Sequence, residues 1–160
     1  MSEKGKTLKV LAELAYTRFE NSVKDLKEVE SMWKPVPEAN NIKWILTHLS
    51  QQWNLGFQRT IKGDMSYKPT GWPDDYVGNM NISLLKLRED LNHGKIEVLT
   101  GLDKLTTADL ASELTTPRGT RKREDMLMMS ITEIIHHEGQ IAYIRGAIGR
   151  IRQRDPSFLS

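Results

Sequence analysis

Apolar residues recur every three or four positions in four separate segments of this 160-residue chain, and this spacing restricts those segments to helices. The pattern predicts helices over about 7–32, from 38 or 40 to 61, over 79–100, and from an N-cap at Thr120 to about 152. No segment alternates polar and apolar residues for long enough to predict a strand. Four long helices within residues 1–160 indicate an all-α fold, a four-helix bundle forming a single domain.

The segments between these helices contain the residues that typically end helices. Residues 62–78 hold three Gly and two Pro and predict a long loop, a kind of segment that is often functional in compact domains. Its Tyr67, Trp72 and Tyr76 would either shape a pocket at one end of the bundle or plug that end. Residues 106–114 predict a short extra helical turn.

The composition narrows the chemistry. The chain has no Cys, so thiolate zinc sites, disulfides and a Cys nucleophile are excluded, and His and carboxylate side chains must carry any chemistry. A chain without Cys and without 18 successive apolar residues is expected in the cytoplasm, away from membranes. The formal net charge of +2 does not favour a nucleic-acid partner.

One short basic run stands out from this balanced charge. Residues 115–119 predict a turn. The basic run RGTRKR, Arg118–Arg123, begins within this turn and continues beyond it. Such a run could contact a phosphate group. The more common outcome for a charge run is a solvated loop, which is the interpretation we favour from the sequence.

The fourth helix carries two polar residues where its apolar stripe predicts Ile or Leu. Glu133 and His137 are four residues apart and fall on the stripe that contains Ile134 and Ile141, so both are expected to enter the core. Burying a carboxylate and an imidazole without a partner costs several kcal/mol, about the range known for unsatisfied polar groups. A bound divalent metal ion would make the pair tolerable, and a buried hydrogen-bond network is the alternative.

The other histidines are candidates for the missing ligand. His48 lies on an inward stripe of the second helix and is the natural third ligand, although a core His bonded to a carbonyl or carboxylate gives the same pattern. His93 shares its face with charged residues and is expected in solvent. His136 points about 100° away from His137. His136 would donate a hydrogen bond to a metal ligand, contact a substrate or lie in a contact between two helices. We favour the interhelical contact.

Two glutamines and a row of small residues complete the candidates. Gln52 lies one turn beyond His48, and Gln140 lies near His137, so either would orient a ligand or substrate. An interhelical hydrogen bond is the simpler expectation for both. Small residues roughly opposite the His137 stripe predict either a homodimer contact or packing of a helix of the same subunit: Gly139, Ala142, Gly146 and Gly149.

The segments Trp44–Leu49, Thr116–Gly119, His137–Ile141 and Tyr143–Arg145 together resemble the DinB-like superfamily, also called the YfiT-like metal-dependent proteins. The resemblance covers essentially the whole chain in helix order and spacing. It implies a bundle that holds one divalent ion, often as a homodimer, with water completing the coordination. Some relatives are transferases or isomerases that depend on low-molecular-weight thiols.

The resemblance also assigns the ligands by position. The family places one His on the second helix and two His four residues apart on the fourth. His48 and His137 match the first and third positions, whereas Glu133 stands where His is more common. This change leaves the metal open, because two imidazoles and a carboxylate suit zinc, nickel and ferrous iron about equally.

Three functions follow as hypotheses. The first is an enzyme, a transferase or hydrolase for a small molecule that uses a metal-activated thiol or water. The alternative is a metal-stabilised binding or stress-response module without turnover. The third is a structural bundle in which the polar residues form only a hydrogen-bond network.

Overall fold

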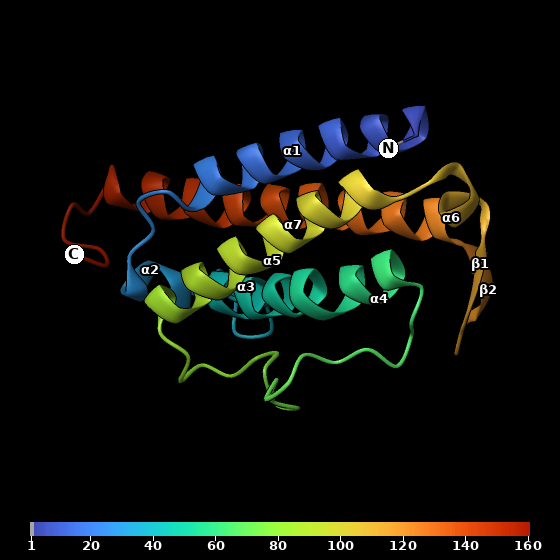
Figure 1. Cartoon of the computed structure of the whole chain (residues 1–160). Coiled ribbons are helices and arrows are strands. Elements are labelled where there is room, and N and C mark those ends of the chain that lie inside the picture. The colour runs from blue at the N-terminus through green and yellow to red at the C-terminus, as the bar shows by residue number, and fades with distance from the viewer. Residues whose placement is uncertain (1) are drawn as a thin grey trace.

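The computed structural model describes residues 2–160 and confirms the four-helix bundle (Figure 1). Its long helical segments are α1 (Glu3–Val23), α3 (Ile42–Gln51) with its extension, α5 (Leu84–Lys104) and α7 (Arg123–Arg152). Apolar residues from all four segments form one buried core, in which the rings of Tyr16 and Phe19 contact the edge of Trp53. Among residues 2–160, no helix is long and apolar enough to cross a membrane.

The second helical segment is continuous, but its hydrogen-bond pattern changes in the middle. α3 passes through one π-helical turn, η1 (Gln52–Gly56), into α4 (Phe57–Lys62), which ends at Gly63 in a left-handed conformation. The predicted end near residue 61 is therefore confirmed, with glycine adopting the positive φ of 70° that closes the helix. The π turn was not expected from the sequence. Such turns within α-helices frequently occur at functional sites.

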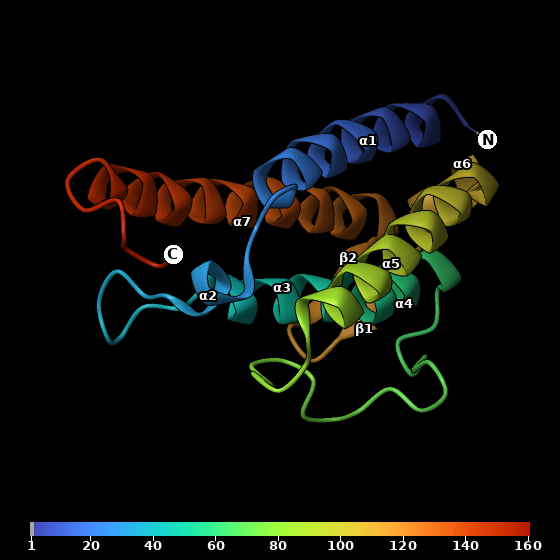
Figure 2. The same ribbon diagram turned by 90° about the vertical axis from the view of Figure 1, so that its left-hand side faces the viewer.

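Contacts between the helices show the direction in which each one runs. Lys4 pairs with Glu124 and Arg18 pairs with Glu138, so α1 and α7 run in the same direction. α5 runs opposite to α1, and the α3–α4 segment runs opposite to α7. α4 and α5 are consequently parallel, and the loop between them must return along the length of the bundle, as Figures 1 and 2 show.

That loop is longer than predicted, because α5 begins at Leu84 rather than near 79. The side chain of Ser83 caps α5 by accepting a hydrogen bond from the backbone N–H of Lys86. Within the loop, the Tyr76 hydroxyl lies 2.9 Å from Ser50 Oγ and donates to Asp90 at 2.7 Å. Tyr76 is buried, so at this point the loop seals the seam between α3 and α5.

The predicted first helix is wrong in one respect, since it is broken after Val23. A second short helix, α2 (Glu28–Met32), follows after four residues that are not helical. Contacts of Glu30 accompany this break. Glu30 is buried, accepts the backbone N–H of Lys27 at the start of α2, and pairs with Arg152 of α7. No Pro or Gly marks this break, so helical spacing alone could not locate it.

The start of the fourth helix also differs from the prediction. β1 (Glu113–Thr116) and β2 (Gly119–Lys122) form an antiparallel hairpin in which Thr116 pairs with Gly119. Gly119 has a φ of 109°, a conformation that favours glycine. Thr120 is therefore a strand residue and not the helix cap. The expected absence of strands was wrong, although the predicted turn lies at the hairpin tip and α6 (Thr107–Ala111) confirms the short helical turn.

The row of small residues on α7 is open on this subunit. A Cβ added at Gly139 or Gly149 would meet nothing within 4 Å, and one at Gly146 would meet only Arg150 of the same helix. Packing of a helix of the same subunit at these glycines is therefore contradicted. The homodimer contact stays a prediction.

Candidate metal centre

The three predicted ligands meet between α3 and α7. His48 comes from the last turn of α3, and Glu133 and His137 come from adjacent turns of α7. Their ligand atoms all lie within 4.8 Å of one another, and His137 Nε2 is 3.4 Å from Glu133 Oε2. The ring centroids of His48 and His137 are 4.8 Å apart. Within residues 2–160 this is the one group of three such side chains that could hold a metal ion.

The three side chains differ in burial. His137 is buried and His48 is half-buried, whereas 53% of the Glu133 side chain is exposed. The prediction that Glu133 enters the core with His137 is therefore wrong. Glu133 lies at the margin of the inward stripe, on the wall of an open cavity, and its carboxylate keeps contact with water instead of bearing the full cost of burial.

Hydrogen bonds within α7 set the orientation of His137. Its Nδ1 lies 2.9 Å from Gln140 Oε1, and because that oxygen can only accept, Nδ1 carries the proton. In the neutral ring the lone pair is then on Nε2, which lies on the side of Glu133. Gln140 Nε2 in turn lies 3.0 Å from Nε2 of the exposed His136. The interhelical role favoured for Gln140 and His136 is contradicted, because both bonds lie within α7.

His48 is held by a different contact. Its ring stacks on Trp44 with a centroid distance of 5.3 Å and an interplanar angle of 9°. Burial lowers the pKa of His48, nearby His137 lowers it further, and Glu133 acts in the opposite direction. The neutral imidazole is consequently favoured near pH 7, and neutral imidazole is the form that can bind a metal.

The donor set fits a divalent ion. Two neutral imidazole nitrogens and one carboxylate are ligands that zinc, nickel and ferrous iron accept. The bond from Gln140 to the non-ligating nitrogen of His137 is the arrangement found behind His ligands of metal sites, where it fixes the tautomer. The residues present therefore fit a metal centre on the chemistry of the side chains and not only on their proximity.

A large cavity opens beside these residues, with a volume of about 600 Å³. His48, Glu133 and the predicted Gln52 line it together with residues from α4, the hairpin and the first turns of α7. Its wall also contains Arg59, Arg118 and Arg121. No sequence feature had indicated Arg59, and a solvated loop was the favoured expectation for the basic run that supplies the other two.

The last Arg of that run has a structural role. Arg123 is buried, and its guanidinium donates to the backbone carbonyls of Thr60 and Ile61 and pairs with Asp109. It thus binds the carbonyl end of α4, where helix carbonyls lack partners. The remaining His, His93, is exposed as expected, and its Nδ1 lies 2.9 Å from Asn54 Oδ1.

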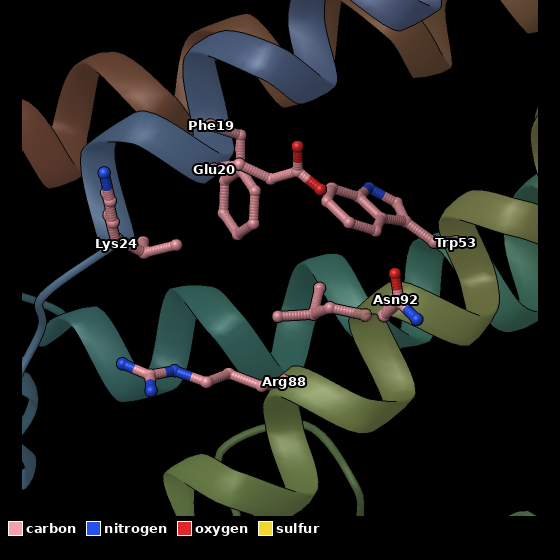
Figure 3. Close-up of a pocket in the computed structure, with 8 residues that line it drawn as sticks. Phe19, Glu20, Lys24, Trp53, Arg88 and Asn92 are labelled. Atoms are coloured by element: carbon pink, nitrogen blue, oxygen red, sulfur yellow. The ribbon is translucent and has the colours of Figure 1, made fainter.

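A second, smaller hollow lies between α1 and α5 (Figure 3), and none of the three candidate ligands lines it. Its volume is about 250 Å³, with Phe19 and Trp53 among its walls and Glu20, Arg88 and Asn92 beside them. Glu20 already pairs with Lys95. This hollow lacks the ligand set, so the cavity at His48 and Glu133 is the stronger candidate for a reaction site.

Comparisons with known proteins agree with this architecture. The family model described as the DinB superfamily matches residues 11–141. The structure of a mycothiol-dependent maleylpyruvate isomerase has a TM-score of 0.68 and 15% identity, over 88% of this chain and 63% of that one. A conserved protein from Enterococcus faecalis has a TM-score of 0.67 and 16% identity, over 91% of this chain and 96% of that one.

At these identities the two structures show a shared fold and no more. The chain spans less than two thirds of the length of the isomerase. No curated protein matches the sequence significantly.

Proposed function

Because this chain belongs to the DinB superfamily, we propose that it is a metal-dependent enzyme, a transferase or hydrolase that acts on a small molecule with an activated thiol or water. The observation that carries this proposal is that His48, Glu133 and His137 come together beside an open cavity, whose wall contains His48 and Glu133. Structural metal sites are typically closed by four protein ligands, whereas catalytic sites have three and face a substrate space.

Each side chain has a defined part in this proposal. His48 and His137 would hold a divalent ion through neutral nitrogens, and Gln140 would keep His137 in the required tautomer. Glu133 would be the third ligand and would offset part of the positive charge. A divalent ion bound there would lower the pKa of a coordinated water or thiol, which is the chemistry that a nucleophile near neutral pH needs.

The source of a thiol must lie outside the chain, which contains no Cys. The structural neighbour that is a mycothiol-dependent isomerase supports a low-molecular-weight thiol as the second reactant. We therefore place transfer to or from a small thiol ahead of hydrolysis. A non-catalytic metal-binding module is the competing proposal, and the open cavity beside the ligands argues against it.

Metal content is the direct test. Protein purified without an affinity tag is expected to contain about one divalent ion per chain by elemental analysis, and His48→Ala and His137→Ala are each expected to lose it. His93→Ala is the matched control, because His93 is exposed and lies on α5, outside the group of three candidate ligands. Full occupancy in both ligand variants would defeat the proposal. A retained metal with no reaction against any thiol and electrophile pair would favour the non-catalytic module.

A further inference from the structure

We infer that the cavity beside the three ligands binds a small molecule that carries an anionic group, a carboxylate or a phosphate, and that Arg59 and Arg121 receive this group. The inference deepens the proposed function and rests on it, because it names the substrate class of the same cavity. Its basis is the charge, geometry and apolar surface of the cavity wall.

The charge of the wall is one-sided. Three Arg residues line the cavity, Arg59, Arg118 and Arg121, and among the described residues that line it Glu133 is the only one with a carboxylate. A bound cation would offset that carboxylate as well. The chain as a whole carries a formal net charge of +2, so this concentration of positive charge is local. Fields of one sign in a concave site attract ligands of the opposite sign.

Two of these guanidinium groups, that of the half-buried Arg59 and that of the exposed Arg121, are positioned by contacts that leave donors available. Arg59 Nε donates to the carbonyl of Tyr67 at 2.9 Å, which holds the half-buried side chain while its two terminal nitrogens make no hydrogen bond within residues 2–160. Arg121 Nη1 contacts Met129 Sδ at 3.4 Å, so this hairpin side chain reaches across to α7. A planar guanidinium with free donors suits two-point bonding to a carboxylate or phosphate.

Free guanidinium donors are not a property of every Arg in the basic run, as Arg123 shows. Arg123 is buried, and its guanidinium is occupied by two carbonyls and by Asp109. Arg118 lies at the exposed tip of the hairpin, where it would add charge without a fixed position. Arg59 and Arg121 are therefore the two side chains that we expect to bind the anionic group.

The remaining wall describes the rest of the ligand. Met65, Met126, Met129 and Pro117 contribute apolar surface to the same cavity, and its volume of about 600 Å³ is in the range of small-molecule sites. Methionine side chains adapt to irregular apolar shapes. A ligand with an anionic head, a short apolar body and a reacting end directed at His48 and Glu133 matches these three surfaces.

Nuclear magnetic resonance on the ¹⁵N-labelled full chain, with and without one equivalent of zinc, tests the inference. The probes are hexanoate and its neutral counterpart hexanamide, with inorganic phosphate as a separate arm. Hexanoate is expected to shift the side-chain N–H signals of Arg59 and Arg121 saturably, and hexanamide to leave them unchanged. Saturable shifts with phosphate alone would also support the anion site and would assign it to phosphate.

Variants separate an anion site from unspecific charge. Arg59→Gln and Arg121→Gln are each expected to weaken hexanoate binding roughly tenfold, the effect of one lost charge-assisted hydrogen bond, and the double variant to abolish it. Arg154→Gln is the matched control, since Arg154 is exposed and does not line the cavity. Equal binding of hexanamide, or undiminished hexanoate binding in the correctly folded double variant, would overturn the inference.

The measurement with zinc distinguishes a failure of this inference from a failure of the proposed function. Zinc binding that depends on His48 and His137, without any anion response at Arg59 and Arg121, would overturn the inference and leave the proposed function intact. An anion response without zinc binding would refute the metal-dependent enzyme and leave an anion-binding cavity.

Discussion

Replacing Gln140 by Leu removes the hydrogen bond behind the candidate metal centre, along with the bond from Gln140 to His136, and leaves His48, Glu133 and His137 in place. Gln140 Oε1 fixes the proton of His137 on Nδ1 at a distance of 2.9 Å, and without it the ring can place its proton on either nitrogen. Hydrogen-bond partners of His ligands typically contribute about 10- to 100-fold in metal affinity. Gln140 is exposed, so water can partly replace its amide. We therefore expect the lower end, a zinc Kd about tenfold higher, or about 1.4 kcal/mol.

Competition against a chromophoric zinc chelator measures this Kd. The free energy of unfolding of the metal-free variant is expected to change by less than about 1 kcal/mol, because exposed positions rarely contribute more. Gln153→Leu, at the exposed C-terminal end of the same helix, is the matched control and should keep the wild-type Kd. An unchanged zinc Kd in Gln140→Leu, with binding abolished in His137→Ala, would refute the role assigned to Gln140.

Three other predictions concern the bundle itself. Ile134→Ala is expected to lower the free energy of unfolding, measured in urea, by about 2–4 kcal/mol because Ile134 is 0% exposed. Ile135→Ala, at a residue that is 41% exposed, should lower it by less than about 1 kcal/mol. Equal losses in the two variants would contradict the buried and exposed faces assigned to α7. Burial raises the pKa of Tyr16 and Tyr76, so the unfolded chain loses these two protons at a lower pH than the folded chain. The free energy of unfolding should therefore fall as pH rises above about 10. If all tyrosines of the folded protein developed phenolate absorbance at their ordinary pKa, this burial would be contradicted. Gly146→Trp should lower the mass measured by light scattering if the small-residue face is a homodimer contact, and an unchanged dimer mass with native helicity would remove that face as the contact.

The sequence predicted the features that depend on local periodicity. Four helices, the short extra turn and the meeting of His48, Glu133 and His137 follow from residue spacing, because side chains on one helical stripe must face the same neighbours. Gly63 was readable as a helix end for a similar reason, since its left-handed conformation is a local property.

The features that were missed depend on contacts between distant residues. The break after Val23 is associated with the pairing of buried Glu30 with Arg152, which is far away in the chain. Glu133 lies on the inward stripe by spacing, but whether that edge of the stripe is covered depends on how the hairpin and α4 leave the cavity open. Residue spacing contains no information on either arrangement.

The π-helical turn η1 lies between two residues that line the cavity, His48 before it and Arg59 after it on the same continuous segment. A π turn fits one extra residue into a helix, so deleting a single residue within Gln52–Gly56 would restore a regular α-helix and leave the residues beyond it in nearly the same rotational phase. The same deletion in a regular α-helical part of the segment between His48 and Arg59 would rotate everything beyond it by about 100°. At η1, therefore, relatives of this chain could lose one residue and still keep the relative directions of His48 and Arg59.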